Sequence, residues 1–271
     1  MTELDVALEA AVAAGRVIGR GAAQQIRRKG DVDLVTEVDE AAEAAIRAVL
    51  GQHLPDIDVL AEEGGGAWDS LTRWVVDPLD GTTNFVHGLP WYCVSIALEI
   101  DGVATVGVVY DPVRDVAFVS DGRRAWTKRA LCASPIEGPP LRVSETSLLG
   151  DALVATGFAT DHKTRSEVHC VRVEAVLRNC RCVRRCGSAA LDLAHVAAGV
   201  FDVYLETDLH PWDVAAGVLL VSVAGGRVTD WNGGGLDRRR PSPVATNGLL
   251  HSFALTDLAV PKNLTIAAKW V

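Results

Sequence analysis

The chain has 271 residues, of which 49% are hydrophobic and 23% are charged, a balance typical of a folded globular protein. This length allows one large α/β unit or two smaller subdomains with a sizeable core. The formal net charge of −9 excludes the overall basic character that nucleic-acid binders require. An acidic protein that acts on an anionic substrate would need bound metal cations to reverse the local sign of its charge.

Neither a secretion signal nor a membrane anchor is expected. Charged residues are spread through residues 1–21, where a signal peptide needs an uninterrupted apolar stretch. The longest uncharged apolar run, residues 214–226, is too short to span a bilayer. We therefore expect a soluble, cytoplasmic protein with reduced cysteines. The spacing of Cys180, Cys182 and Cys186 does not fit a zinc site. The basic run Arg238–Arg240 is interpreted as a solvated loop.

The first half is predicted to form helices followed by an antiparallel sheet. Apolar residues recur at helical spacing from Leu4 to Ile18, and Thr36 is a suitable N-cap for a second helix. Asp101-Gly102 is a strong hairpin signal between two β-rich runs, and Asp121-Gly122 ends the next run. The predicted strands therefore cover residues 74–76, 94–100, 103–110 and 116–120.

The second half alternates between strands and helices, a pattern that predicts an α/β layer. The predicted strands are residues 152–156, 182–185, 201–206 and 226–229, and the predicted helices are residues 166–177, 188–198 and 214–223. The segment Arg123–Arg142, rich in proline and arginine, is the expected joint between the halves. We therefore predict two subdomains, residues 1–142 and residues 143–271.

The chemistry is concentrated in the segment Trp74–Phe85, which reads W-V-V-D-P-L-D-G-T-T-N-F. Asp77 and Asp80 stand three residues apart at the end of a predicted buried strand, where their oxygens can converge on hard cations. The N–H groups of Gly81 and Thr82 would then face a phosphate. Taken alone, D-P-L-D-G is equally well explained as a turn, because Asp, Pro and Gly are turn formers. The residues on either side are too particular for a generic turn.

With its continuation V-H-G-L-P, this string resembles the first signature of the inositol monophosphatase family. Trp212–Gly217, followed by Ala224-Gly225-Gly226, is similar to the family's second signature. The pair Glu62-Glu63 stands where the family keeps its remaining metal carboxylate. The resemblance runs from about Gly30 to Gly248, with the three motifs in the family's order.

The resemblance implies a layered α-β-α-β-α sandwich, with an antiparallel sheet in the N-terminal half and a mixed sheet in the C-terminal half. It also implies lithium-sensitive, Mg²⁺-dependent hydrolysis of a phosphate monoester, commonly by a homodimer. One Mg²⁺ would be held by Glu62, Asp77 and the carbonyl of Leu79, and the second by Asp77, Asp80 and Asp213. Taken alone, Glu62-Glu63 fits a solvated acidic loop and Asp213 fits a helix N-terminal acid.

The other site residues follow from the same resemblance. Thr82 and Glu62 would orient the attacking water with Asp39 behind Thr82, and Lys29 would belong to a flexible lid. Alternatively, Lys29 is an exposed charge, and Gly187-Ser188-Ala189 is a plain helix cap. His87 and His210 are expected to be structural or peripheral. The residues expected to contact substrate are Asp80, Gly81, Thr82, Gly187, Ser188, Ala189, Glu206 and Asp213.

The leading functional prediction is hydrolysis of myo-inositol monophosphate, a small phosphorylated polyol. Alternatives within the family are phosphatases for fructose bisphosphate, histidinol phosphate or 3′-phosphoadenosine phosphate, and T-T-N-F after D-G favours the inositol type. An alternative of another class is a regulatory partner of RNA or the transcription machinery, which the acidity and the complete carboxylate set disfavour. Residues 123–141 depart from the family pattern, so their conformation stays open.

Overall fold

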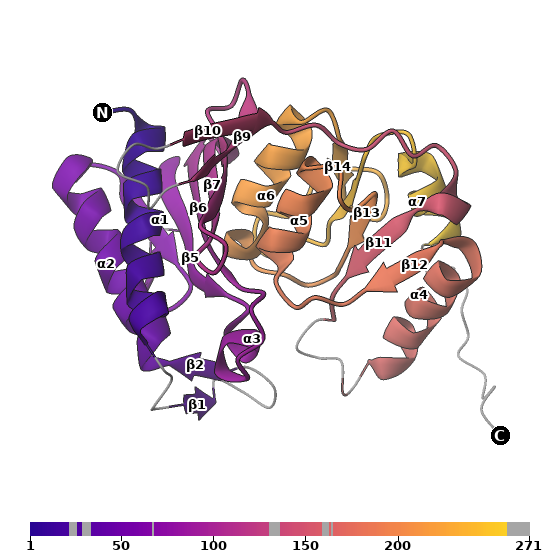
Figure 1. Cartoon of the computed structure of the whole chain (residues 1–271), viewed down its shortest axis with the longest axis horizontal. Helices are drawn as coiled ribbons and strands as arrows, with labels where there is room; N and C mark the ends of the chain where they lie inside the picture. The colour runs from indigo at the N-terminus through magenta and orange to yellow at the C-terminus, as the bar shows by residue number, and fades with distance from the viewer. Residues whose placement is uncertain are drawn as a thin grey trace.

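The computed structural model describes residues 1–21, 26–28, 34–66, 68–129, 136–158, 163 and 165–258. Within these residues the elements form five layers, visible from left to right in Figure 1. Helices α1 and α2 cover one face of a large sheet, and α5 and α6 fill the space between that sheet and a smaller one. Helices α4 and α7 cover the far side. The expected α-β-α-β-α sandwich is therefore confirmed.

The two outer helices of the N-terminal half each begin with a capping box. Helix α1 (Glu3–Arg20) is capped by Thr2 and helix α2 (Glu37–His53) by Thr36, and each threonine side chain accepts a backbone N–H of the first turn. Each cap is completed by an aspartate that accepts the N–H of the capping residue. The apolar faces of both helices pack on the large sheet. Both predicted helices are confirmed.

The large sheet has the strand order β10-β9-β8-β7-β6-β5-β3-β4. Its pairs are antiparallel except β3 with β5, a parallel pair that departs from the purely antiparallel expectation. The predicted strand near Trp74 extends through Asp80, with a register irregularity between Asp77 and Asp80. The strands are β3 (Asp58–Ala61), β4 (Gly65–Gly66), β5 (Thr72–Asp80), β6 (Cys93–Ile100), β7 (Val103–Asp111), β8 (Val116–Ser120), β9 (Ala125–Arg129) and β10 (Ile136–Pro140).

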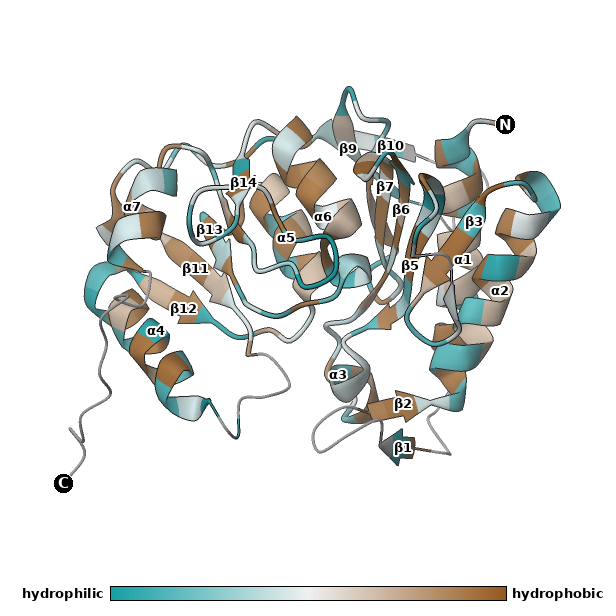
Figure 2. Cartoon of the chain, turned by 180° about the vertical axis from the view of Figure 1, so that it is seen from behind, coloured by the Kyte–Doolittle hydropathy of each residue, from teal (hydrophilic) through white to brown (hydrophobic). Residues whose placement is uncertain are grey.

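The second sheet is mixed, as expected, with the order β12-β11-β13-β15-β14. Its strands are β11 (Leu153–Thr156), β12 (Cys182–Arg184), β13 (Val203–Leu205), β14 (Arg227–Thr229) and β15 (Val244–Thr246). The helices are α4 (Ser166–Asn179), α5 (Ala189–Ala197), α6 (Pro211–Val223) and α7 (His251–Asp257), with a short 3-10 turn at Leu149–Asp151. Figure 2 shows α5 and α6 largely in brown, because both helices lie between sheets and are apolar on most sides.

Several elements lie where no element was predicted. The expected joint Arg123–Arg142 contains strands β9 and β10, which continue the large sheet to its edge. The short strands β1 (Ile26–Arg28) and β2 (Leu34–Thr36) form a separate two-stranded sheet. Helix α3 (Thr82–Val86) directly follows the acidic turn. Within the described residues, no helix is both long and apolar enough to cross a membrane.

Candidate active site

The acidic turn at the end of β5 is held by its own backbone. The N–H of Leu79 donates a hydrogen bond of 3.0 Å to Asp77 Oδ1, and the Asp77 side chain is buried. Gly81 has φ of +99°, a conformation that L side chains rarely adopt. A Cβ atom at Gly81 would lie 3.0 Å from the carbonyl oxygen of Trp91 and 3.3 Å from that of Gly187. Glycine therefore allows this turn to approach the Gly187 turn of the other half.

A second link joins the acidic turn to helix α2. The Thr82 hydroxyl donates a hydrogen bond of 2.9 Å to Asp39 Oδ1 and lies 3.1 Å from the carbonyl oxygen of Leu79. The other oxygen of Asp39 accepts the backbone N–H and the hydroxyl of Thr36, at 2.8 and 2.6 Å. The carboxylate of Asp39 is fully buried. The helix cap at Thr36 therefore also fixes the orientation of the Thr82 hydroxyl.

Asp80 connects the two halves of the chain. Its Oδ2 accepts hydrogen bonds from the Ser188 hydroxyl at 2.6 Å and from the backbone N–H of Ala190 at 2.7 Å. Ser188 is at the same time the N-cap of α5, because its Oγ accepts the N–H of Leu191 at 3.3 Å. Ser188 is therefore a helix cap, as one of the two predictions from the sequence proposed, and it also holds the Asp80 carboxylate.

The carboxylates of the site raise one another's pKa. Burial raises the pKa of Asp77 well above its ordinary value, and the negative charges of Glu62, Asp80 and Asp213 raise it further. Burial likewise raises the pKa of Asp213, followed by the charges of Asp80 and Glu62. Burial also raises the pKa of Asp80, while the hydrogen bonds that this carboxylate accepts from Ser188 and Ala190 lower it. Four acidic groups from three separated motifs therefore form one mutually repelling cluster.

Such a cluster has the chemistry of a hard-cation site. Its donors are carboxylate oxygens, buried at Asp77 and half-buried at Glu62, Asp80 and Asp213. Divalent cations such as Mg²⁺ prefer oxygen ligands, and a bound cation would relieve the repulsion between them. Across the residues that the structure describes, no three Asp, Glu, His or Cys side chains stand close enough together to form a ready-made metal cage. The predicted ligands fit a metal by charge and atom type, and not by a preformed arrangement of their side chains.

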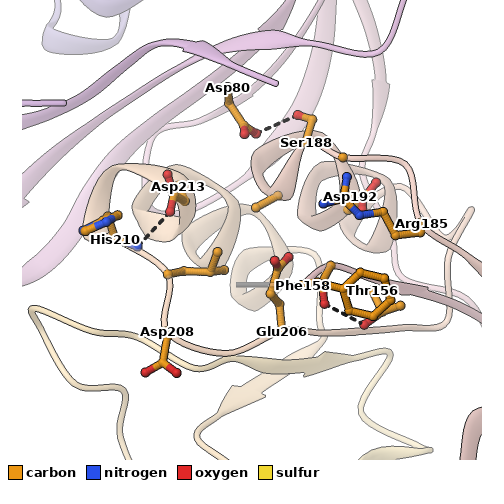
Figure 3. Close-up of a pocket in the computed structure, with 14 residues that line it drawn as sticks. Asp80, Thr156, Phe158, Arg185, Ser188, Asp192, Glu206, Asp208, His210 and Asp213 are labelled. Atoms are coloured by element: carbon orange, nitrogen blue, oxygen red, sulfur yellow. Dashed lines mark hydrogen bonds between the residues drawn. The ribbon is translucent and has the colours of Figure 1, made fainter. Parts of the chain in front are cut away.

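A cavity of about 170 Å³ opens beside Asp80 and Asp213 (Figure 3). The predicted substrate residues that line it are Asp80, Gly187, Ser188, Ala189, Glu206 and Asp213. Of the remaining predicted residues, Glu62, Asp77, Leu79, Gly81, Thr82 and Asp39 are described but do not belong to its lining. Lys29 lies outside the described residues.

Glu206 lines this cavity below Asp80 in the view of Figure 3. The Tyr204 hydroxyl donates a hydrogen bond of 2.7 Å to Glu206 Oε2. Burial raises the pKa of Glu206 to about 7, while the Tyr204 bond and the charge of Arg185 act in the opposite direction. A Cβ atom at Gly157 would lie 1.9 Å from Glu206 Oε2, so a glycine is required for the carboxylate to lie there.

Sequence reasoning missed several residues that line the cavity. Arg185 lies with its guanidinium 5.8 Å from the ring centre of Phe158. Asp192 accepts a hydrogen bond of 3.3 Å from the indole N–H of Trp91, and burial raises the pKa of this aspartate well above its ordinary value. Both residues stand within three positions of the Gly187-Ser188-Ala189 motif, so their closeness to it in the sequence could have marked them as candidates.

His210, expected to be structural or peripheral, also lines the cavity. Its backbone N–H donates a hydrogen bond of 2.7 Å to Asp213 Oδ2 (Figure 3). The ring of His210 stacks on that of Trp212, with centroids 4.8 Å apart and an interplanar angle of 11°. His210 therefore supports the start of α6 and borders the site.

Comparison with known proteins agrees with this arrangement. The model of the inositol monophosphatase family matches residues 1–260. The inositol-1-monophosphatase of Synechocystis sp. is 42% identical over 255 residues, which cover 92% of this chain and 86% of that protein. The Nus factor SuhB of Escherichia coli (strain K12) is 41% identical over 237 residues, covering 85% of this chain and 86% of that protein.

A solved structure of inositol monophosphatase from Anabaena superposes with a TM-score of 0.81 at 39% identity, covering 94% of both chains. The extragenic suppressor protein suhB from Bartonella henselae gives a TM-score of 0.82 at 37% identity and covers 96% of this chain and 98% of that one. The sequence signatures, the five layers and the buried acidic cluster therefore have one common explanation: the chain belongs to the inositol monophosphatase family.

Proposed function

We propose that this chain hydrolyses small phosphorylated polyols, with myo-inositol monophosphate as the substrate to which its cavity is adapted. The observation that carries the proposal is the placement of Asp80, Asp213 and Glu206 around one cavity. Asp80 and Asp213 belong to the acidic cluster, which is suited to bind the cations that would neutralise the charge of a phosphate. Glu206 offers a carboxylate to the hydroxyl groups of the substrate. Relatives named inositol monophosphatase support this choice of substrate.

In this proposal, Glu62, Asp77 and the carbonyl of Leu79 hold one Mg²⁺, and Asp77, Asp80 and Asp213 hold a second. When bound, the two ions supply charge neutralisation for the phosphoryl oxygens and lower the pKa of a water molecule. The buried, mutually repelling carboxylates favour binding of the cations, because protonation is the alternative way to relieve their repulsion.

The protein side chains then orient the reactants. The Thr82 hydroxyl, whose position is fixed by Asp39, and the carboxylate of Glu62 hold the attacking water in line with the phosphorus atom. The start of α5, with Gly187, Ser188 and Ala189, lines the cavity that would receive the phosphate. Gly81 and Thr82, at the start of α3, would present their N–H groups to the phosphate.

Glu206 acts on the alcohol part of the substrate. Its carboxylate can accept hydrogen bonds from two neighbouring hydroxyls, and Tyr204 holds one carboxylate oxygen in place. A site built in this way rejects phosphate esters that lack those hydroxyls, because its buried polar groups would be left unpaired. We further propose that residues 1–142 and 143–271 are two subdomains and that the protein is a homodimer.

Phosphate release from a panel of monoesters tests the proposal. The panel contains myo-inositol 1-phosphate, fructose 1,6-bisphosphate, histidinol phosphate and 3′-phosphoadenosine phosphate, each with Mg²⁺. We expect the highest kcat/KM on inositol phosphate and near loss of turnover in Asp213→Asn. Asp121→Asn, which removes one negative charge from the turn after β8, is the matched control. Wild-type turnover by Asp213→Asn at limiting Mg²⁺ would reject the metal assignment.

The relatives named Nus factor SuhB favour a second candidate, a regulatory partner of the transcription machinery. Affinity capture from cell extract with the wild type and with Asp213→Asn separates the two functions. A partner retained by both proteins, with and without Mg²⁺, would support a binding role that is independent of hydrolysis. Hydrolysis without specific capture would leave the phosphatase as the sole activity.

A further inference from the structure

Two tryptophans from opposite halves of the chain meet beside the acidic cluster. Trp68 lies in the loop between β4 and β5, and Trp212 lies in the first turn of α6, directly before Asp213. Their ring centroids are 6.0 Å apart with an interplanar angle of 56°, and Trp212 stacks in turn on His210. The connection between β3 and β5, which begins at Glu62 and includes the short strand β4, is therefore in contact through Trp68 with the helix that carries Asp213.

The backbone and the ring of Trp68 are both anchored by Arg73 of β5. The Arg73 side chain is almost completely buried and donates a hydrogen bond of 2.7 Å to the carbonyl oxygen of Trp68. Its guanidinium carbon lies 5.9 Å from the centre of the Trp68 ring. Glu99 neutralises this buried cation through contacts of 3.0 Å at Nε and 2.8 Å at an Nη atom. Trp68 is therefore fixed to the start of β5.

A segment of the C-terminal half crosses back onto Trp68. We name residues 237–240 the arginine strap. Arg239 lies with its guanidinium carbon 5.2 Å from the centre of the Trp68 ring and 3.7 Å from Asp69, and Arg238 lies 3.9 Å from Glu99. Asp237 shapes the strap by accepting the backbone N–H groups of residues 239 and 240, both at 2.7 Å. The three arginines are exposed and lie in a loop, as predicted from the sequence, and Arg238 and Arg239 also contact the other half.

The first part of this connection, the turn between β3 and β4, is fixed by helix α2. The buried carboxylate of Glu43 accepts the backbone N–H groups of Glu63 and Gly64 at 2.9 and 3.0 Å, and it is paired with Arg47 at 2.7 Å. The N–H of Glu62 itself donates to the carbonyl oxygen of Val76 at 3.2 Å. Glu62 therefore lies in a turn that Glu43 holds to its own half, and the connection that continues from this turn through β4 reaches the other half at Trp68.

We propose that Trp68 is a positioning residue for divalent cation binding: pressed against Trp212 by the arginine strap, it sets the separation of Glu62 and Asp213. This inference rests on the proposed metal site and adds a determinant outside the ligands. Groups that orient metal ligands typically change metal affinity about 10- to 100-fold when they are removed. Cation–π contacts at exposed sites are weaker, so the strap arginine should have a smaller effect than the tryptophan.

Calorimetric titration of Mg²⁺ into the full chain, freed of metal by chelation, tests the proposal directly. We expect Trp68→Ala to weaken Mg²⁺ binding about tenfold, Arg239→Ala to weaken it about twofold, and Trp68→Phe to retain most of the affinity. Arg124→Ala is the matched control, since Arg124 also covers a tryptophan, Trp126, at 4.2 Å and pairs with an aspartate at 3.5 Å. This control should bind Mg²⁺ like the wild type.

Enzyme assays give a second readout. Trp68→Ala should require about tenfold more Mg²⁺ for half-maximal turnover, with kcat at saturating Mg²⁺ within about twofold of the wild type. Thermal unfolding in chelator identifies a variant that fails to fold, in which case Trp68→Phe and Arg239→Ala carry the test. Unchanged Mg²⁺ affinity in Trp68→Ala, or equal losses in Arg239→Ala and Arg124→Ala, would overturn the inference. Absence of Mg²⁺ binding by the wild type would instead reject the proposed metal site and the inference with it.

Discussion

The Ser188 hydroxyl donates a hydrogen bond of 2.6 Å to Asp80 Oδ2, across 108 positions of sequence. Asp80 closes the last strand segment before α3, and Ser188 opens α5, so the bond joins the ends of two elements from different halves. The N–H of Ala190 reaches the same oxygen at 2.7 Å. One carboxylate oxygen is thereby held by the second half, which orients Asp80 relative to Asp213.

Ser188→Ala should reduce kcat/KM for inositol phosphate about 10- to 100-fold, because a hydrogen bond to a charged group contributes about 1.5–3 kcal/mol. The substitution also removes the N-cap of α5, at a cost to folding of about 1 kcal/mol. Thr2→Ala removes the cap of α1 and is the control for that loss of stability. Steady-state kinetics that change equally in both variants would show that only the cap matters.

Thr82→Ala should lower kcat about 100-fold, because the hydroxyl between Asp39 and the Leu79 carbonyl no longer orients the water. Thr82→Ser keeps the hydroxyl and should restore most of kcat. The KM for substrate should change little in both variants. A Thr82→Ala enzyme with kcat within threefold of the wild type would remove Thr82 from the catalytic group.

The local motifs could be predicted from the sequence, whereas the contacts between distant segments could not. Asp77, Asp80 and Asp213 stand in short strings whose residue types are characteristic by themselves. Asp192 enters the site through a tertiary contact with Trp91, 101 positions away, which no periodicity indicates. Tyr204 is two residues before Glu206, so the strand period could have placed the two side chains on one face. Some strands could not be predicted either, because they are very short.

Strands β1, β2, β4 and β15 have two or three residues, too few to show an alternating pattern. Strand β10 contains two prolines, Pro139 and Pro140, and lies at the edge of the large sheet, where proline is tolerated. The prolines therefore led us to predict a connecting segment between the two halves, whereas strands β9 and β10 continue the large sheet there. The Trp68–Trp212 contact was equally hidden, because neither residue lies in a periodic run.

Removal of divalent metal should abolish turnover. The expected ligands are oxygen atoms of Glu62, Asp77, Asp80 and Asp213, a set that favours a hard cation over Zn²⁺. Activity measured after chelation and after stepwise return of Mg²⁺ checks this expectation, and millimolar lithium should inhibit the restored enzyme. An enzyme that kept full activity in excess chelator would contradict the two-metal proposal.

Glu206→Gln should reduce kcat/KM for inositol phosphate about 10- to 100-fold more than for p-nitrophenyl phosphate. The carboxylate can accept charge-assisted hydrogen bonds from the polyol hydroxyls, and p-nitrophenyl phosphate lacks those hydroxyls. Tyr204→Phe, which frees the carboxylate from its 2.7 Å partner, should have a weaker effect of the same kind. A parallel loss on both substrates would exclude Glu206 from substrate binding.

The same residue should make the stability of the metal-free protein depend on pH. The pKa of Glu206 is raised by burial from 4.5 to about 7, so the folded state retains a proton that the unfolded state has lost. The wild type should therefore lose stability relative to Glu206→Gln as the pH rises from about 4.5 to about 7, and the difference should be constant outside that window. Its size is about 3 kcal/mol, because one pKa unit corresponds to about 1.4 kcal/mol.

Denaturant unfolding of both proteins in chelator, at intervals between pH 4 and pH 8, measures this difference. Acidic groups remote from Glu206 titrate alike in both proteins, so their contributions cancel when the two curves are subtracted. The charge of Glu206 raises the pKa of Asp192 and Asp213, so the measured difference includes its effect on these two neighbours. Glu167→Gln, in the exposed first turn of α4, is the control for the loss of one negative charge from the whole molecule. A pH-independent difference between wild type and Glu206→Gln would show that the buried carboxylate keeps an ordinary pKa. The same curve in Glu167→Gln would assign the effect to net charge, and burial of Glu206 beside Tyr204 would not be its cause.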